Sequence, residues 1–214
     1  MTKFFQVCAA ASLTSMLVAC GGGGGDGPAP AGPLTALAGT WVGDCGTGAN
    51  AGVRDKFIIT VNSEGTAMEI QNEIDYFAAA DCSGTPGATL YHRSASVKAT
   101  SKGQADVNTP GLNSQVVKAE TAEVVVASGS PNILSKGLYV SYTMQSRDFV
   151  WKKEWCVSGV AGNPNPYCFF DNDVTLSSGT TSAGFYINGA TLYTYQDDDG
   201  NSQFESSGTF QRLP

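Results

Sequence analysis

The sequence predicts an all-β fold, a single antiparallel and mostly up-and-down β-barrel of about eight to ten strands. Apolar and polar residues alternate with a period of two in several segments, which is the pattern of strands with one buried face. Turn residues recur roughly every 8–15 positions between these segments. After residue 20 no segment has the three-to-four-residue spacing of an amphipathic helix. A β-sandwich is the alternative architecture, since it gives the same pattern.

The alternation is clearest between residues 57 and 76. One face carries Phe57, Ile59 and Val61, and after a turn at 62–65 a second strand carries Met68, Ile70, Ile74 and Tyr76 on one face. The other face of that second strand carries Glu69, Gln71, Glu73 and Asp75, which predicts an outer face in contact with water. Further strands are expected at 89–100, 115–127, 138–144, 149–155, 167–176, 184–187, 191–195 and 203–212. Asp199-Gly200 marks the turn of the last hairpin.

The charge of the chain argues against nucleic-acid binding. The formal net charge is −7, and removing the N-terminal segment that holds Lys3 takes it from −7 to −8. No cluster of Lys and Arg with interleaved aromatic residues is present. An acidic surface is also poorly suited to direct binding of anionic lipid head groups, so membrane attachment is expected to come from acyl chains.

The first twenty residues predict export and lipidation. Lys3 precedes an apolar run of about 15 residues, which is too short for a permanent membrane span. The run ends in Leu17-Val18-Ala19-Cys20, followed by a glycine-rich stretch. This segment resembles the lipobox of bacterial lipoproteins. The resemblance implies a signal peptide over 1–19, a Cys20 that carries acyl chains such as palmitate, a flexible linker over 20–33 and a folded domain over 34–214.

The residue after the lipidated cysteine is Gly21, not Asp. By resemblance to Gram-negative lipoproteins, no inner-membrane retention signal is present, which favours a lipid-anchored position at the outer membrane. Whether the domain faces the periplasm or the cell surface is open.

Four cysteines remain after Cys8 and Cys20 are set aside. Cys45, Cys82, Cys156 and Cys168 form an even set, which in an oxidising compartment predicts two disulfides with three conceivable connectivities. We favour Cys45–Cys82 and Cys156–Cys168, because the second pair flanks a Gly- and Pro-containing loop over 157–167.

The two ends of the domain carry a second resemblance. Leu37-Ala38-Gly39-Thr40-Trp41 resembles the Gly-x-Trp signature that opens lipocalin-like barrels, and Arg212 lies where the final strand of such a barrel carries an arginine. The resemblance implies that Trp41 plugs one end of the barrel and that Arg212 stacks over it. The plain alternative is that Trp41 is a core aromatic residue on an N-terminal strand.

A barrel of this size predicts a pocket for one small apolar molecule. Its expected lining is Phe57, Ile59, Leu138, Val140, Tyr142 and Trp151. The alternative function is that of a structural or interaction lipoprotein, such as an adhesin, an inhibitor or an envelope-assembly partner, that acts through surface loops such as 157–167. No cofactor is expected, and the sequence does not identify a protein partner.

No catalytic constellation is apparent, so we expect a protein that is not an enzyme and holds no metal. His92 is the only histidine, and no Gly-x-Ser-x-Gly motif accompanies it. Glu73 and Asp75 could form a carboxylate pair, but a solvated strand face is the simpler interpretation. The acidic residues at 197–201 and 171–173 are better explained as turn chemistry than as calcium loops.

Overall fold

The computed structural model describes residues 31–92, 97–127, 133–145, 150–170, 178–197 and 199–214. Within these ranges the strands are β1 (Gly39–Gly43), β2 (Val53–Val61), β3 (Ala67–Tyr76), β4 (Ala88–His92), β5 (Val97–Thr109), β6 (Gln115–Val126), β7 (Ile133–Lys136), β8 (Tyr139–Gln145), β9 (Val150–Val157), β10 (Tyr167–Phe170), β11 (Gly179–Asn188), β12 (Thr191–Asp197) and β13 (Glu205–Arg212). Four short 3-10 helices accompany them: η1 (Thr35–Leu37), η2 (Gly48–Asn50), η3 (Pro110–Leu112) and η4 (Val160–Gly162). None of the described helices is long and apolar enough to cross a membrane. The predicted all-β fold is confirmed.

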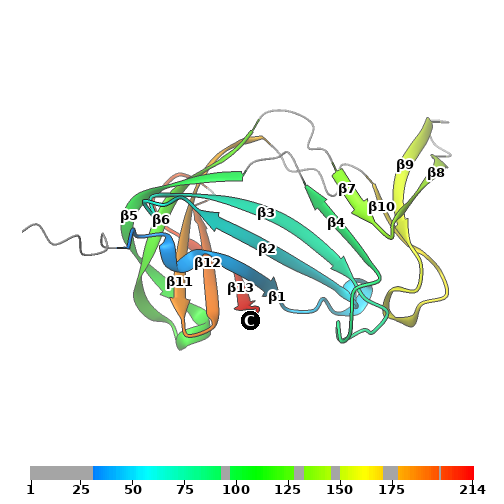
Figure 1. The fold of residues 1–214 in the computed structure, drawn as a ribbon, viewed down its shortest axis with the longest axis horizontal. Helices are drawn as coiled ribbons and strands as arrows, with labels where there is room; N and C mark the ends of the chain where they lie inside the picture. Colours follow the sequence, from blue (N-terminus) through cyan, green and yellow to red (C-terminus); the bar gives the residue numbers. More distant parts are fainter. Residues whose placement is uncertain (1–30, 93–96, 128–132, 146–149, 171–177, 198) are drawn as a thin grey trace, which may run out of the picture. The chain divides into compact units, whose positions relative to one another are not determined.

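Eight strands close into an antiparallel barrel (Figure 1). The order around it is β1, β2, β3, β5, β6, β11, β12 and β13, and β13 pairs with β1 to complete the ring. Strand order in space therefore follows strand order in the chain, which is the predicted up-and-down topology. Two insertions interrupt it, with β4 between β3 and β5 and β7 to β10 between β6 and β11.

The strands of the insertions pair in ways that the sequence did not predict. The first half of β3 pairs with β5, whereas its second half, Glu73–Tyr76, pairs with β4. The single strand expected over 89–100 is consequently two strands, β4 and the beginning of β5. β7 pairs with the free side of β4, and β8, β9 and β10 form a separate three-stranded sheet.

The main core lies inside the barrel and follows the period-two alternation. Its buried members include Trp41, Ile59, Met68, Phe185 and Leu192. The hairpin of β2 and β3 is longer than β1, so its inner faces also supply a second core. There Tyr76, with Val53 and Ile74, packs against β9, β10 and η4.

A bulge redirects the β5–β6 hairpin. The pairing register shifts between Ser101 and Gly103, and Gly103 adopts a positive φ of 101°, which glycine tolerates best. Beyond the bulge, Val107 and Ala119 pack against Tyr195, on the face of β12 opposite to Leu192. This satellite cluster covers part of the outside of the barrel.

Both favoured disulfides are confirmed. Cys45–Cys82 joins the loop after β1 to the loop after β3, and Cys156–Cys168 links paired positions of β9 and β10. Each bond holds an extended hairpin or loop that the barrel pairings alone do not fix.

Candidate functional site

One end of the barrel is closed by Trp41. Its side chain is 0% exposed, and its indole N–H donates a hydrogen bond to the Leu37 carbonyl oxygen of η1 at 2.8 Å. The Arg212 guanidinium carbon lies 4.4 Å from the centre of the Trp41 ring, and Arg212 also donates to the carbonyl oxygen of Ala36. The stacking that the lipocalin-like resemblance implies is therefore present. Trp41 and Arg212 together form the closed end, or floor, of the barrel.

Above this floor the barrel holds a cavity of about 450 Å³. That volume lies in the usual range of ligand pockets. The apolar lining comes from every barrel strand except β1, and comprises Phe57, Ile59, Ile70, Val97, Val124, Val126, Ala183, Phe185, Leu192 and Phe210. The polar lining comprises Asp55, Asn72, Thr181, Thr194, Gln196 and Ser207, and Tyr195 also borders the cavity. A mainly apolar wall with a few polar groups is typical of a small-molecule site.

Asn72 and Asp55 are the distinctive polar groups of the cavity. The Asn72 Oδ1 atom is buried and has no hydrogen-bond partner among the described residues, an arrangement that is costly unless a donor is supplied. Asp55 lies farther from Trp41 on β2, with its carboxylate at the solvent-accessible end of the cavity. Desolvation by the surrounding atoms raises the pKa of Asp55 above its ordinary value of 3.8.

The six residues expected to line one pocket are divided between two places. Phe57 and Ile59 line the barrel cavity, as expected. Leu138 packs against the second core, between the barrel hairpin and the three-stranded sheet. Val140, Tyr142 and Trp151 lie on that sheet and are 41%, 61% and 60% exposed. The prediction that all six share a cavity is wrong, because β8 and β9 pair with β10 instead of joining the barrel.

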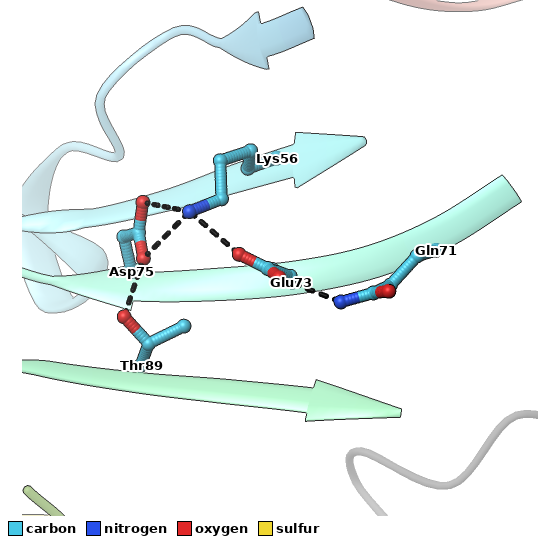
Figure 2. A network of polar contacts seen from close by, with 5 residues as sticks. All are labelled: Lys56, Gln71, Glu73, Asp75 and Thr89. Atoms are coloured by element: carbon cyan, nitrogen blue, oxygen red, sulfur yellow. Dashed lines mark hydrogen bonds and ion pairs between the residues drawn. The ribbon is translucent and has the colours of Figure 1, made fainter. Parts of the chain in front are cut away.

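The outer face of β3 also differs from expectation near its end (Figure 2). Lys56 lies between two carboxylates, with its Nζ atom 2.6 Å from Glu73 and 3.1 Å from Asp75. Thr89 donates a hydrogen bond to Asp75 at 2.7 Å, and Gln71 donates to Glu73 at 2.7 Å. The side chains of Lys56, Glu73 and Asp75 are only 18%, 12% and 4% exposed. The predicted solvated face is therefore wrong here, and the pair of carboxylates is held by a lysine.

The pKa of Lys56 reflects this position. Desolvation lowers it, but the hydrogen bonds to Glu73 and Asp75 and the charges of both carboxylates outweigh that effect. The pKa of Lys56 is consequently raised above 10.5, so the lysine stays charged at neutral pH.

The other candidate residues fall in turns, disulfides or undescribed parts. Asp197 ends β12, Asp198 lies outside the described residues, and Asp199 accepts hydrogen bonds from Asn201 before β13, as turn chemistry predicts. Residues 171–173 lie outside the described residues. His92 ends β4, and its side chain also lies outside the described part. Among the described residues, Glu154 lies near Cys156 and Cys168, but disulfide sulfurs are not thiolate ligands for a metal.

Two site residues were missed by the sequence reasoning although the sequence carried a signal for them. Asp55 is in phase with Phe57 and Ile59, and Asn72 is in phase with Ile70 and Ile74. A polar residue in phase with the apolar face of a strand marks an interior position that needs a partner.

No protein-family model, curated protein or solved structure matches this chain.

Proposed function

We propose that this protein binds a small, mainly apolar molecule inside its barrel. The observation that carries the proposal is the 450 Å³ cavity with its apolar wall above the Trp41 floor. Buried apolar area supplies most of the binding energy in such a site, at roughly 25 cal/mol per Å². The unpaired Asn72 oxygen offers one acceptor that would favour a ligand with a donor group. Binding occurs by burial, without covalent chemistry.

A fluorescent apolar probe, N-phenyl-1-naphthylamine, tests this with the full-length protein. We expect its emission to rise on binding and to saturate at one probe per chain. Ala183→Trp places a large ring in the middle of the cavity and should abolish the rise, as should Thr181→Trp nearer the opening. The second variant keeps the test decisive if the first one fails to fold.

Two control variants separate the cavity from the surface. Val116→Trp adds the same ring at an exposed position of β6, which is 69% exposed, and should leave probe binding unchanged. Trp151→Ser removes an exposed ring from β9. If Trp151→Ser abolishes the signal while Ala183→Trp and Thr181→Trp retain it, the cavity is not the binding site.

We also propose that the protein is anchored in the outer membrane by acyl chains on Cys20. The support is the segment Leu17-Val18-Ala19-Cys20, with the glycine-rich tether that follows it. Metabolic labelling with palmitate should mark the wild-type chain and not the Cys20→Ser variant. Equal labelling of both chains, or of neither, would contradict the anchor.

The alternative role of an interaction protein is favoured by one observation. Large apolar side chains are exposed on both strands of the β8–β9 hairpin, among them Tyr142, Met144 and Trp151. Photo-crosslinking in cells from position 142 should capture a defined protein if this face is an interface. A crosslinker placed at exposed Val116 serves as the control.

A further inference from the structure

A second hollow continues from the barrel cavity. Its volume is about 290 Å³, and its lining includes Asp44, Asp55, Tyr76 and Tyr167. Asp55 also lines the barrel cavity. Among the residues of β2, Asp55, Phe57 and Ile59 line the barrel cavity, whereas Val53 and Asp55 line the hollow. The two spaces therefore follow one another along the inner faces of the same strands.

The hollow presents negative charge that no described cation neutralises. Neither Asp44 nor Asp55 takes part in any ion pair of the described residues. The nearest cations in the sequence, Arg54 and Lys56, lie on the opposite face of β2. Arg54 stacks on the Phe77 ring at 4.6 Å, and Lys56 is held by Glu73 and Asp75.

The aromatic wall adds a surface suited to cations. Tyr76 is 2% exposed and lines the hollow. Its ring stacks on Phe169 at 5.7 Å, and Tyr167 packs against both rings. Burial, together with the charges of Tyr167 and Asp55, raises the pKa of Tyr76, so the phenol stays neutral. Aromatic rings beside carboxylates are a common setting for organic ammonium groups.

We infer that the ligand of this protein is a cationic amphiphile, whose ammonium head is held by Asp55 and Asp44 beside Tyr76, and whose apolar tail enters the barrel. The inference rests on the proposed function, because the tail uses the barrel cavity. Asp55 is the residue at the junction, where the charged head would meet the apolar chain. The Tyr76 hydroxyl and the two carboxylates accept the N–H donors of the head.

Three probes with the same six-carbon tail test the choice of head group. Hexylammonium, hexanol and hexanoate are titrated calorimetrically into the full-length protein at pH 7. We expect hexylammonium to bind about fivefold or more tightly than hexanol, and hexanoate to bind most weakly. Asp55→Asn should weaken hexylammonium binding about five- to tenfold and leave hexanol binding unchanged. Asp106→Asn removes the same charge from an exposed position of β5 and is the matched control.

The outcomes distinguish this inference from the proposed function. If hexanol binds and hexylammonium binds no more tightly, or if Asp55→Asn and Asp106→Asn behave alike, the cationic head is wrong and the apolar cavity stands. If no probe binds and N-phenyl-1-naphthylamine also fails, the proposed function itself is wrong. Tyr76→Phe removes only the hydroxyl, and a loss of hexylammonium affinity in that variant supports the placement of the head.

Discussion

Replacing Lys56 by methionine should destabilise the protein by about 2–3 kcal/mol. Breaking a buried ion pair costs roughly 3–5 kcal/mol, since the partner charges stay desolvated without a counter-ion. Lys56 is 18% exposed, so water screens part of that cost. Two carboxylates, Glu73 and Asp75, lose their shared cation, and their mutual repulsion adds to the loss. For a domain of this size the expected fall in Tm is about 5–10 °C.

Urea unfolding followed by tryptophan fluorescence measures this loss. Lys118→Met is the matched control, because Lys118 pairs with Asp106 at 2.8 Å but both side chains are more than 60% exposed. Such a surface pair contributes less than about 1 kcal/mol. If Lys56→Met costs no more than Lys118→Met, the buried network does not stabilise the fold as argued.

The dependence of the unfolding free energy on pH at alkaline pH gives a second check on Lys56. Its pKa is raised on folding, so its contribution is complete below 10.5 and is lost as the pH rises through the folded value. The difference in unfolding free energy between wild type and Lys56→Met should therefore be constant from pH 7 to about 9.5 and shrink above 10.5. A difference that does not shrink above pH 10.5 would contradict the assignment.

Three further predictions concern the floor, the three-stranded sheet and the cavity opening. Arg212→Lys should cost about 1 kcal/mol in urea unfolding, because a lysine does not reproduce the flat stacking on Trp41 or the contact with η1; an unchanged midpoint would contradict it. Replacing Cys156 and Cys168 together by serine should cost about 3 kcal/mol on the chain-entropy estimate for a short loop, with β8–β10 protected less from hydrogen exchange than the barrel; equal loss of protection throughout would count against it. Asp55→Asn should stabilise the ligand-free protein at pH 7, because the raised pKa of Asp55 means that stability falls as the pH rises through that value. The gain should vanish below pH 3.8, and a gain that persists at pH 3 would show another cause.

Several elements could be predicted because their signals are local. The alternation from Met68 to Tyr76 gives β3 (Ala67–Tyr76), and the turn at Asp199-Gly200 separates β12 from β13. Val140, Tyr142 and Trp151 show why the site could not be predicted in the same way. Alternation indicates that one face of a strand is apolar, but it does not indicate which sheet the strand joins.

The burial of Glu73 and Asp75 also could not be predicted from a local pattern. Their positions on β3 follow from a period of two, but Lys56 and Thr89 reach them from β2 and β4. Which side chains lie across a ladder depends on pairings between residues that are distant in the chain, so a local pattern shows a charged face and not its counter-ions.

By itself the sequence determined the all-β class and an even set of four cysteines, because strand alternation and cysteine number are local properties of the chain. It left three disulfide connectivities open, and the stacking of Arg212 on Trp41 followed only from the resemblance to lipocalin-like barrels. Only the tertiary structure decided that β7 to β10 leave the barrel, that Phe57 and Ile59 line a cavity without Trp151, and that Asp55 stands between that cavity and an acidic, aromatic hollow. The physical reason is that the pairing partners of a strand depend on the free energy of the whole sheet. Which face of the strand is apolar depends only on the strand's own residues.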